Sequence, residues 1–289
     1  MPDLPTGLDL TERISSEYYS LTSTEKKVAD YIVGHRGEAQ HMSISELAQI
    51  SGAAEATLSR FARRLGYKGY NDFRTAVAIS AETAGNKLNP LSGAITENDS
   101  FDEVLRKLYT ADMDAVRQTS ELLTEESVNA AVNCLAEADK VFCMGQGGSS
   151  IIAEEAAHLF TTIGCKYFCV VDSHTQMITA ATLTERDTLL YFSYSGATKD
   201  MIDTLSLARK RKARIILITH FLHSPGAALA DVVLLCGANE SPLQLGSVPA
   251  KMAQIYIIDV LFSGLCLRDL DGCSETRHRI ADALAEKHL

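Results

Sequence analysis

The sequence predicts a protein of the α/β class, in which an all-α domain is followed by a doubly wound, parallel, five-stranded α/β domain. The first 85 residues space their apolar side chains as helices do and contain no convincing strand, whereas short apolar runs alternate with longer helical stretches beyond Ala138. Two of these runs end in turns rich in Gly and Ser, GQGGSS and SYSGAT. Such alternation implies a parallel sheet covered on both faces, with ligands beyond the carboxyl ends of its strands.

The composition is that of a globular protein, because 46% of the 289 residues are apolar and only 22% are charged. No run approaches the roughly 18 consecutive apolar residues of a membrane span. The start, MPDLPTGLDL, also lacks the basic and apolar blocks of a signal peptide. We therefore expect a cytosolic protein with no membrane partner.

The seven cysteines form no Cys-x-x-Cys pair, and most of them lie in apolar stretches. Cys165 and Cys169 are four residues apart, but on a predicted strand, where that spacing does not gather metal ligands. We expect reduced thiols in the core, and neither a metal nor another cofactor.

A polar segment divides the chain. Residues 84–100 read AGNKLNPLSGAITENDS, which is rich in Gly, Asn, Ser and Pro and has no apolar periodicity. We predict a helical domain over residues 1–85, a linker over residues 86–100 and an α/β domain over residues 101–289.

Two capping boxes mark helix starts in the first domain. Thr22 and Glu25 form one, and Ser43 and Glu46 form the other. The apolar residues that follow them at helical spacing include Val28, Ile32, Leu47 and Ile50.

Residues 44–63 have the spacing of a helix-turn-helix motif. Ala48 is small where the two helices would cross, and Gly52 tolerates a left-handed turn between them. The buried stripe of the second helix would consist of Leu58, Phe61 and Leu65.

The other face of this second helix is basic. The whole chain has a net charge of −10, which argues against nucleic acid, yet residues 57–74 contain five Lys or Arg against a single Asp. A recognition helix reads base edges with its N-terminal half and binds phosphates through flanking basic residues. The alternative is a plain three-helix bundle with a solvated basic face.

We therefore predict double-stranded operator DNA as a partner. The predicted DNA-binding residues are Glu55, Ser59 and Arg60 at base edges, Arg63, Arg64 and Lys68 on the phosphate backbone, and Thr57 on the same helix.

The second domain begins with two helical stretches, over residues 101–123 and 125–138. The strands that follow centre on Val141, Val170, Tyr191, Ile216 and Val233.

The first strand leads into GQGGSS, residues 145–150, called here the glycine loop. Its glycines let the backbone approach an anion closely, and a helix beginning near Ser149 would point unpaired N–H groups and its positive dipole end at the same spot. A phosphate could therefore bind there without any lysine.

The third strand leads into SYSGAT, residues 193–198, called here the hydroxyl loop. Ser193, Ser195 and Thr198 place three hydroxyl donors around one turn, with Gly196 as its hinge. One such loop would be an ordinary capped turn. Two of them in strand-to-helix units predict a phosphate-binding site.

These motifs together resemble those of the RpiR-type bacterial transcription regulators, which join an N-terminal helix-turn-helix domain to a C-terminal sugar isomerase (SIS) domain that senses phosphosugars. The resemblance covers nearly the whole chain. It rests on LTSTEKKVADYIV, on residues 44–74, on GQGGSS and SYSGAT, and on GSVPAKMAQIYIIDVLF at residues 246–262.

The resemblance implies that hydroxyls of both loops hold a phosphosugar, and that the protein is a symmetric homodimer or homotetramer. Two residues depart from the family pattern: Tyr194 stands where many SIS domains carry Gln, and Ala54 stands where a Ser often starts the recognition helix. The predicted phosphosugar-binding residues are Gly147, Gly148, Ser149, Ser193, Tyr194, Ser195, Thr198, Glu240 and Lys251.

We predict a regulator of sugar metabolism whose operator affinity changes when a phosphosugar occupies the SIS domain, with no catalytic residue. The rival is a sugar-phosphate isomerase or lyase, which needs an acid or a base near the loops. Candidates for that role are Glu154, Glu155, His158, His220, His223 and Glu240. The attached DNA-binding domain favours sensing over turnover.

A dinucleotide-binding enzyme is a second rival, because Gly145-x-Gly147-x-x-Ser150 nearly matches the Gly-x-Gly-x-x-Gly pattern and Asp172 stands where a ribose-binding acid would lie. The third glycine is missing, and the hydroxyl loop has no role in that scheme.

Overall fold

The structure is a computed structural model that describes residues 10–85, 95–222, 224–237 and 247–285. The chain forms two compact units, one of helices and one around a five-stranded sheet. The domain limits expected from the sequence remain a prediction.

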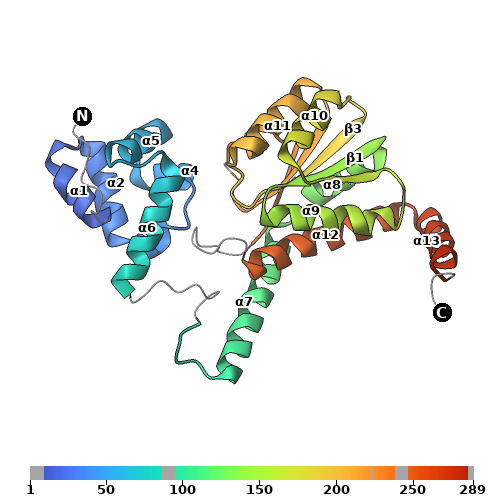
Figure 1. Cartoon of the computed structure of the whole chain (residues 1–289), viewed down its shortest axis with the longest axis horizontal. Helices are drawn as coiled ribbons and strands as arrows, with labels where there is room; N and C mark the ends of the chain where they lie inside the picture. The colour runs from blue at the N-terminus through green and yellow to red at the C-terminus, as the bar shows by residue number, and fades with distance from the viewer. Residues whose placement is uncertain (1–9, 86–94, 223, 238–246, 286–289) are drawn as a thin grey trace. The chain divides into compact units, whose positions relative to one another are not determined.

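The first unit is helical throughout its described residues, as the sequence predicts (Figure 1). Its elements are α1 (Leu10–Glu17), η1 (Tyr18–Ser20), α2 (Ser23–Gly34), α3 (Arg36–Ala39), α4 (Ile44–Ser51), α5 (Glu55–Arg64) and α6 (Tyr70–Gly85). Both capping boxes are confirmed: the hydroxyls of Thr22 and Ser43 accept the N–H groups of Glu25 and Glu46, whose carboxylates reach back to the cap residues.

The core of this unit gathers the apolar side chains that the spacing predicts, with one exception. Val28, Ile32, Leu47, Leu58, Phe61 and Leu65 are all fully buried or nearly so. Ile50 shares the helical spacing but is 51% exposed. The buried face of α4 runs through Leu47, Ala48 and Ser51, which turns Ile50 toward solvent.

The second unit contains the five predicted strands, and all of them are parallel, in the order β2-β1-β3-β4-β5. Its strands are β1 (Lys140–Gly145), β2 (Tyr167–Val170), β3 (Asp187–Phe192), β4 (Arg214–Thr219) and β5 (Val232–Leu235). Its helices are α7 (Phe101–Leu122), whose residues up to Lys107 fall in the first unit, α8 (Glu125–Glu137), α9 (Gly148–Thr161), α10 (Ser173–Thr182), α11 (Lys199–Lys210), η2 (Ala227–Leu229), α12 (Val248–Arg268) and α13 (Leu270–Ala285).

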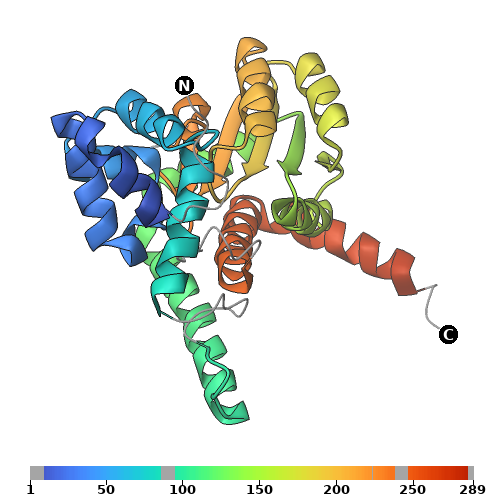
Figure 2. The same cartoon turned by 60° about the vertical axis from the view of Figure 1, so that its left-hand side comes forward.

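Helices cover both faces of this sheet, which confirms the doubly wound fold. Side chains of α8, α9 and α12 pack with those of one sheet face around Phe192 and Ile216. Side chains of α11 pack on the other face, around Tyr191 and Leu217, and α10 packs against α11. The two layers are visible on opposite sides of the strands in Figures 1 and 2.

By length and composition, α12 could cross a membrane. Its Ala253, Ile257 and Leu261 are fully buried in the core on the α8 and α9 side of the sheet. A core helix of a globular protein is expected to be this apolar.

All seven cysteines are free thiols, and Cys143 and Cys236 are buried. Burial raises the pKa of Cys143 well above its ordinary value, so this thiol is unreactive. Cys165 is exposed and precedes β2, so its expected place on a strand is wrong. Residue 165 lies in the connection between α9 and β2.

Candidate functional site

The helix-turn-helix motif consists of α4, a short turn and α5. Gly52 has a φ of 66° and ends α4 by donating its N–H to the carbonyl of Ala48, which confirms the left-handed turn. Ala54 is the N-cap of α5 and offers no side-chain hydrogen bond, as expected where the family often has Ser. The helix therefore begins with its first N–H groups uncapped by a side chain.

One face of α5 is buried and the other is exposed. Leu58, Phe61 and Ala62 pack into the core. The predicted DNA-binding side chains of Glu55, Arg60, Arg63 and Lys68 are exposed, and those of Thr57 and Ser59 are half-buried. The structure thus brings the basic residues and Ser59 onto the accessible side of this helix and the turn that follows it.

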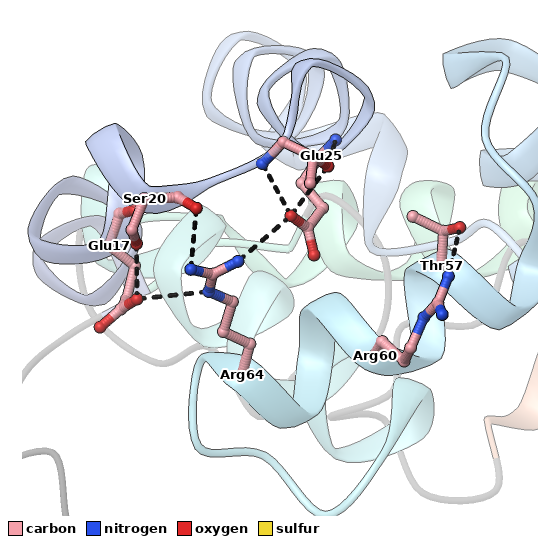
Figure 3. A network of polar contacts seen from close by, with 7 residues as sticks. Glu17, Ser20, Glu25, Thr57, Arg60 and Arg64 are labelled. Atoms are coloured by element: carbon pink, nitrogen blue, oxygen red, sulfur yellow. Dashed lines mark hydrogen bonds and ion pairs between the residues drawn. The ribbon is translucent and has the colours of Figure 1, made fainter. Parts of the chain in front are cut away.

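Three of these side chains, those of Glu55, Thr57 and Arg60, have partners within the unit. Glu55 accepts a hydrogen bond from the hydroxyl of Ser45 on α4, which ties the start of α5 to the preceding helix. Arg60 donates to the hydroxyl of Thr57 at 3.3 Å, one turn earlier on the same helix (Figure 3). This single bond leaves most of the Arg60 guanidinium available to a ligand.

Arg64 is different, because its guanidinium is bound on three sides (Figure 3). Its Nε lies 3.3 Å from a carboxylate oxygen of Glu17, its Nη1 lies 3.3 Å from one of Glu25, and its Nη2 donates to the carbonyl of Ser20 at 2.8 Å. Glu25 is buried and also closes the capping box with Thr22. Arg64 therefore joins the end of α5 to α1, η1 and the start of α2.

In the sheet unit, the glycine loop and the hydroxyl loop follow neighbouring strands. The glycine loop begins at the last residue of β1, and the hydroxyl loop follows β3, which is paired with β1 along its whole length. From this pair the chain continues in opposite directions, to β2 on one side and to β4 on the other. This is the topological switch point, where open parallel sheets bind ligands.

The glycine loop brings main-chain N–H groups to this edge of the sheet. A Cβ on Gly145 would lie 2.4 Å from the carbonyl oxygen of Ser149, so only glycine allows this close turn. Gly147 is left-handed, with a φ of 55°. No acceptor among the described residues takes the N–H groups of Gly147 and Gly148. They lie at the positive end of the α9 dipole, as an anion site requires.

Gln176 on α10 holds this loop in place, although no sequence motif singled it out. Its side chain is fully buried, and its Nε2 donates to the carbonyls of Gly145 and Val170 at the ends of β1 and β2. Its Oε1 accepts from Gln146 in the loop and from the hydroxyl of Tyr191. Burial raises the pKa of Tyr191 to about 12, so it stays a neutral donor.

The hydroxyl loop uses its serines to shape itself. The Oγ of Ser193 accepts the N–H of Gly196 at 3.2 Å, and the Oγ of Ser195 accepts the N–H of Ala197 at 3.3 Å. Each hydroxyl uses a lone pair within the loop, and its proton can be donated to an incoming oxygen. Thr198 is the exposed N-cap of α11 and makes no side-chain cap bond.

Gly196 has both a left-handed conformation and no room for a side chain. Its φ is 58°, and an added Cβ would lie 2.1 Å from the hydroxyl oxygen of Ser224. Its carbonyl accepts the N–H of Gly226. The segment after β4 therefore packs directly against the hydroxyl loop.

Tyr194 is half-buried and stacks on His220, with ring centroids 5.0 Å apart and planes 5° from parallel. The imidazole Nδ1 of His220 lies 2.9 Å from the carbonyl oxygen of Cys236, which makes Nδ1 the protonated nitrogen. At position 194, where many SIS domains carry Gln, this chain has a tyrosine whose ring stacks on the imidazole of His220.

The other candidate residues belong to neither loop. Lys251 is half-buried in the first turn of α12. Glu240 and His223 lie outside the described residues. The acids and the base proposed for an isomerase, Glu154, Glu155 and His158, are exposed on α9.

Asp172 acts as a helix cap. Its carboxylate accepts the N–H and the hydroxyl of Thr175, and these hydrogen bonds lower the pKa of Asp172. In a dinucleotide-binding enzyme this carboxylate would bind a ribose, but here it is used by its hydrogen bonds to Thr175. No group of His, Cys, Asp or Glu side chains in the described part of the chain could hold a metal ion.

Two family models match the chain. Residues 8–84 match the helix-turn-helix domain of the rpiR family, and residues 134–264 match the SIS domain. An HTH-type transcriptional regulator of Haemophilus influenzae is 30% identical over 97% of this chain and 98% of its own length. One of Caldanaerobacter subterraneus is 31% identical over 84% of this chain and 85% of its own.

Among solved structures, the Vibrio vulnificus NanR protein complexed with ManNAc-6P is similar over 97% of this chain and 100% of its own, with a TM-score of 0.85 and 26% identity. The sugar isomerase domain of an RpiR transcription factor from Sphaerobacter thermophilus covers 62% of this chain and 98% of its own, with a TM-score of 0.57 and 23% identity. The latter supports the fold of the sheet unit alone.

Proposed function

The chain belongs to the rpiR family of helix-turn-helix transcription regulators that carry an SIS domain, and from this premise we propose that it binds operator DNA through α5 and a phosphosugar through the two loops. The observation that carries the proposal is the pair of loops at the switch point between β1 and β3. Both loops present donors, and neither presents a carboxylate.

The phosphate end of the effector would lie between the loops. It would accept the N–H groups of Gly147 and Gly148 and the hydroxyls of Ser149, Ser193, Ser195 and Thr198. These donors are neutral, so the positive field that the loops provide comes from the N-terminal dipole ends of α9 and α11, which begin at the two loops. We retain Glu240 and Lys251 as candidates for the sugar end, with Tyr194.

The similarity to the NanR protein complexed with ManNAc-6P makes that compound the first ligand to test. Its phosphate would suit the loops, and its sugar would face Tyr194. The stacked ring pair of Tyr194 and His220 offers a flat surface of the kind on which sugar rings pack.

On DNA, we propose that Glu55, Thr57, Ser59 and Arg60 face base edges and that Arg63 and Lys68 contact phosphates. The exposure of the charged members of this set and the accessible face of α5 support the assignment. Arg64 was predicted to contact phosphate, but its guanidinium is already bound by Glu17, Glu25 and Ser20. We assign it to holding α5 in place.

We further propose that the protein is cytoplasmic, that it works as a homodimer or homotetramer on a two-fold operator, and that it does not turn its effector over. The exposure of Glu154, Glu155 and His158 on α9 supports sensing rather than catalysis. Incubation with ManNAc-6P, followed by NMR, should show no product. A product that disappears in Glu155→Gln would establish an enzyme instead.

The test of the effector site is isothermal titration with ManNAc-6P of the Ser195→Ala and Thr198→Val variants. Each lost hydrogen bond to a charged phosphate should weaken binding about tenfold, which corresponds to about 1.4 kcal/mol. Thr161→Val is the matched control, because that hydroxyl bonds the carbonyl of His158 at the far end of α9. Unchanged affinity in both loop variants, or equal affinity for unphosphorylated ManNAc, would place the effector elsewhere.

A further inference from the structure

We propose that His220 and Thr119 are positioning residues that connect the hydroxyl loop to α7 and so pass the occupancy of the pocket to the helix that leads, along the chain, to the DNA-binding unit. The proposal rests on the proposed function. It assigns a regulatory role to a continuous set of contacts, all within the sheet unit, that runs from Tyr194 through His220 and residues 236–237 to Thr119.

The first step joins Tyr194 to the end of β4. The carbonyl of Tyr194 accepts the N–H of His220 and the hydroxyl of Thr219, both at 3.0 Å. The rings of Tyr194 and His220 are stacked at 5.0 Å, and Phe221 meets both rings edge-on. A ligand that moves Tyr194 must therefore move His220 or break these contacts.

The second step joins His220 to the segment after β5. Its Nδ1 lies 2.9 Å from the carbonyl oxygen of Cys236, and the N–H of Cys236 donates to the carbonyl of Thr219 at 2.9 Å. Cys236 is fully buried. Losing a hydrogen bond at a buried group is costly, so the position of residue 236 follows that of His220.

The third step joins this segment to α7. The N–H of Gly237 donates to the hydroxyl of Thr119 at 2.9 Å, and that hydroxyl donates in turn to the carbonyl of Ala115 at 2.7 Å. Thr119 is fully buried. A Cβ on Gly237 would lie 2.5 Å from the Cβ of Gln118, so the main chain packs directly on the helix.

The lever is α7 itself, which runs from Phe101 to Leu122. Thr119 lies near its end, and the chain before its start leads to the helix-turn-helix unit. At about 1.5 Å per residue, roughly 27 Å of helix separates Thr119 from Phe101, so a tilt of about 5° moves the far end by roughly 2 Å. Small shifts at an effector site are commonly amplified by rigid elements in this way.

The test separates binding from coupling. Thr119→Val removes the hydroxyl that accepts the N–H of Gly237 and keeps the branched shape. The affinity for ManNAc-6P is measured by titration calorimetry, and the affinity for a labelled duplex, selected from random sequence by the wild-type protein, is measured with and without ManNAc-6P. The ratio of the two duplex affinities is the coupling factor, which is about 5 to 150 in typical allosteric proteins.

We expect Thr119→Val to bind ManNAc-6P within about twofold of the wild type while its coupling factor falls toward 1. Thr119→Ser, which restores the hydroxyl, should recover the coupling. Thr188→Val is the matched control. Its hydroxyl is equally buried and donates to the carbonyl of Cys134, but it lies at the other end of β3, so its coupling should be that of the wild type.

Full coupling in a folded Thr119→Val protein would overturn the proposal, as would equal loss in Thr188→Val. If Thr119→Val does not fold, His220→Leu tests the second step without touching α7. Because the His220 ring also belongs to the proposed sugar surface, its coupling factor is measured at a ManNAc-6P concentration that titration shows to saturate the variant, and it should fall toward 1. Coupling retained at saturation overturns the proposal. If the wild-type protein binds no phosphosugar, the proposed function itself is wrong. If the wild type binds ManNAc-6P and changes its DNA affinity, and the variants do so equally, only this inference is wrong.

Discussion

The helix α5 and the two loops of the sheet unit offer different chemistry to a phosphate. The exposed face of α5 presents full positive charges on long side chains, at Arg60 and Arg63, with Lys68 beyond it. The loops present N–H groups of glycines and hydroxyls of serines, and the hydroxyls of Ser193 and Ser195 are held by hydrogen bonds within the hydroxyl loop. One surface suits a polymer of phosphates, and the other suits a single phosphate of defined position.

The difference follows from the range of each interaction. A chain with a net charge of −10 repels DNA at a distance, so its DNA-binding surface needs a local excess of cations. A small phosphosugar can instead be bound by short-range donors with fixed geometry, which also distinguish it from other anions. Four experiments test or sharpen this comparison.

The largest expected difference between the two surfaces is in how strongly their binding depends on salt. If a two-fold complex makes about six phosphate contacts, raising the salt from about 50 to about 200 mM should weaken operator binding by about 10³-fold. The affinity for ManNAc-6P should change by no more than about threefold, because no cation of the loops is screened. Fluorescence anisotropy and calorimetry at matched salt measure both. Equal salt slopes would contradict the comparison.

Two of the left-handed glycines, Gly52 and Gly196, should differ next in how much stability a substitution by alanine removes. Gly52→Ala meets no atom within 4 Å, so it should cost only the conformational strain of about 1–2 kcal/mol. Gly196→Ala adds a collision with Ser224 to the same strain and should cost about 3 kcal/mol or more. Scanning calorimetry of both variants measures the loss. Equal destabilisation would show that the hydroxyl loop can move aside.

Substitutions of Arg63 and Arg64 should change different properties, operator binding for Arg63 and the stability of the helical unit for Arg64. Arg64→Ala removes the partner of the buried Glu25 and should destabilise the helical unit by about 1 kcal/mol, since Arg64 is itself partly exposed. The salt slope of operator binding should not change. Arg63→Ala should leave the stability within about 0.5 kcal/mol and lower the slope by about 0.9 for each phosphate that the arginine no longer neutralises.

The reverse pattern would be a lower salt slope in Arg64→Ala and a lower stability in Arg63→Ala. It would show that Arg64 contacts DNA phosphate. Glu17→Gln serves as the control, because it weakens the Arg64 network without removing a cation.

The smallest effect concerns the start of α5. Ala54→Ser supplies the N-cap that α2 and α4 already have, and should stabilise the helical unit by about 0.5–1 kcal/mol. Chemical denaturation measures it. No gain would mean that the contact between Glu55 and Ser45 already serves this helix end.

What the sequence predicted correctly depends on neighbours along the chain. Capping boxes, the left-handed Gly52 and the centres of five strands are each encoded within a few residues, and all are found in the structure. The switch-point geometry of the loops follows once the strand order is known, because β1 and β3 are then adjacent.

What the sequence did not reveal depends on distant partners. The three partners of Arg64 are 47, 44 and 39 residues away, so its charge alone suggested a phosphate contact. Gln176 bonds main-chain carbonyls, one of them 31 residues away, and no side-chain pattern marks such an acceptor. Ile50 has helical spacing, but which face of α4 is buried depends on the helices around it.

The glycine loop also has an evolutionary consequence. Main-chain N–H groups belong to every residue except proline, so a point substitution at Ser149 or Ser195 removes a hydroxyl but leaves the N–H groups of Gly147 and Gly148 in place. If the loops bind the phosphate as proposed, changes at positions 194 and 220 would alter which sugar is accepted, and the N–H groups proposed to hold its phosphate would be inherited unchanged. A biosensor for a different phosphosugar would best be sought by varying those two ring positions.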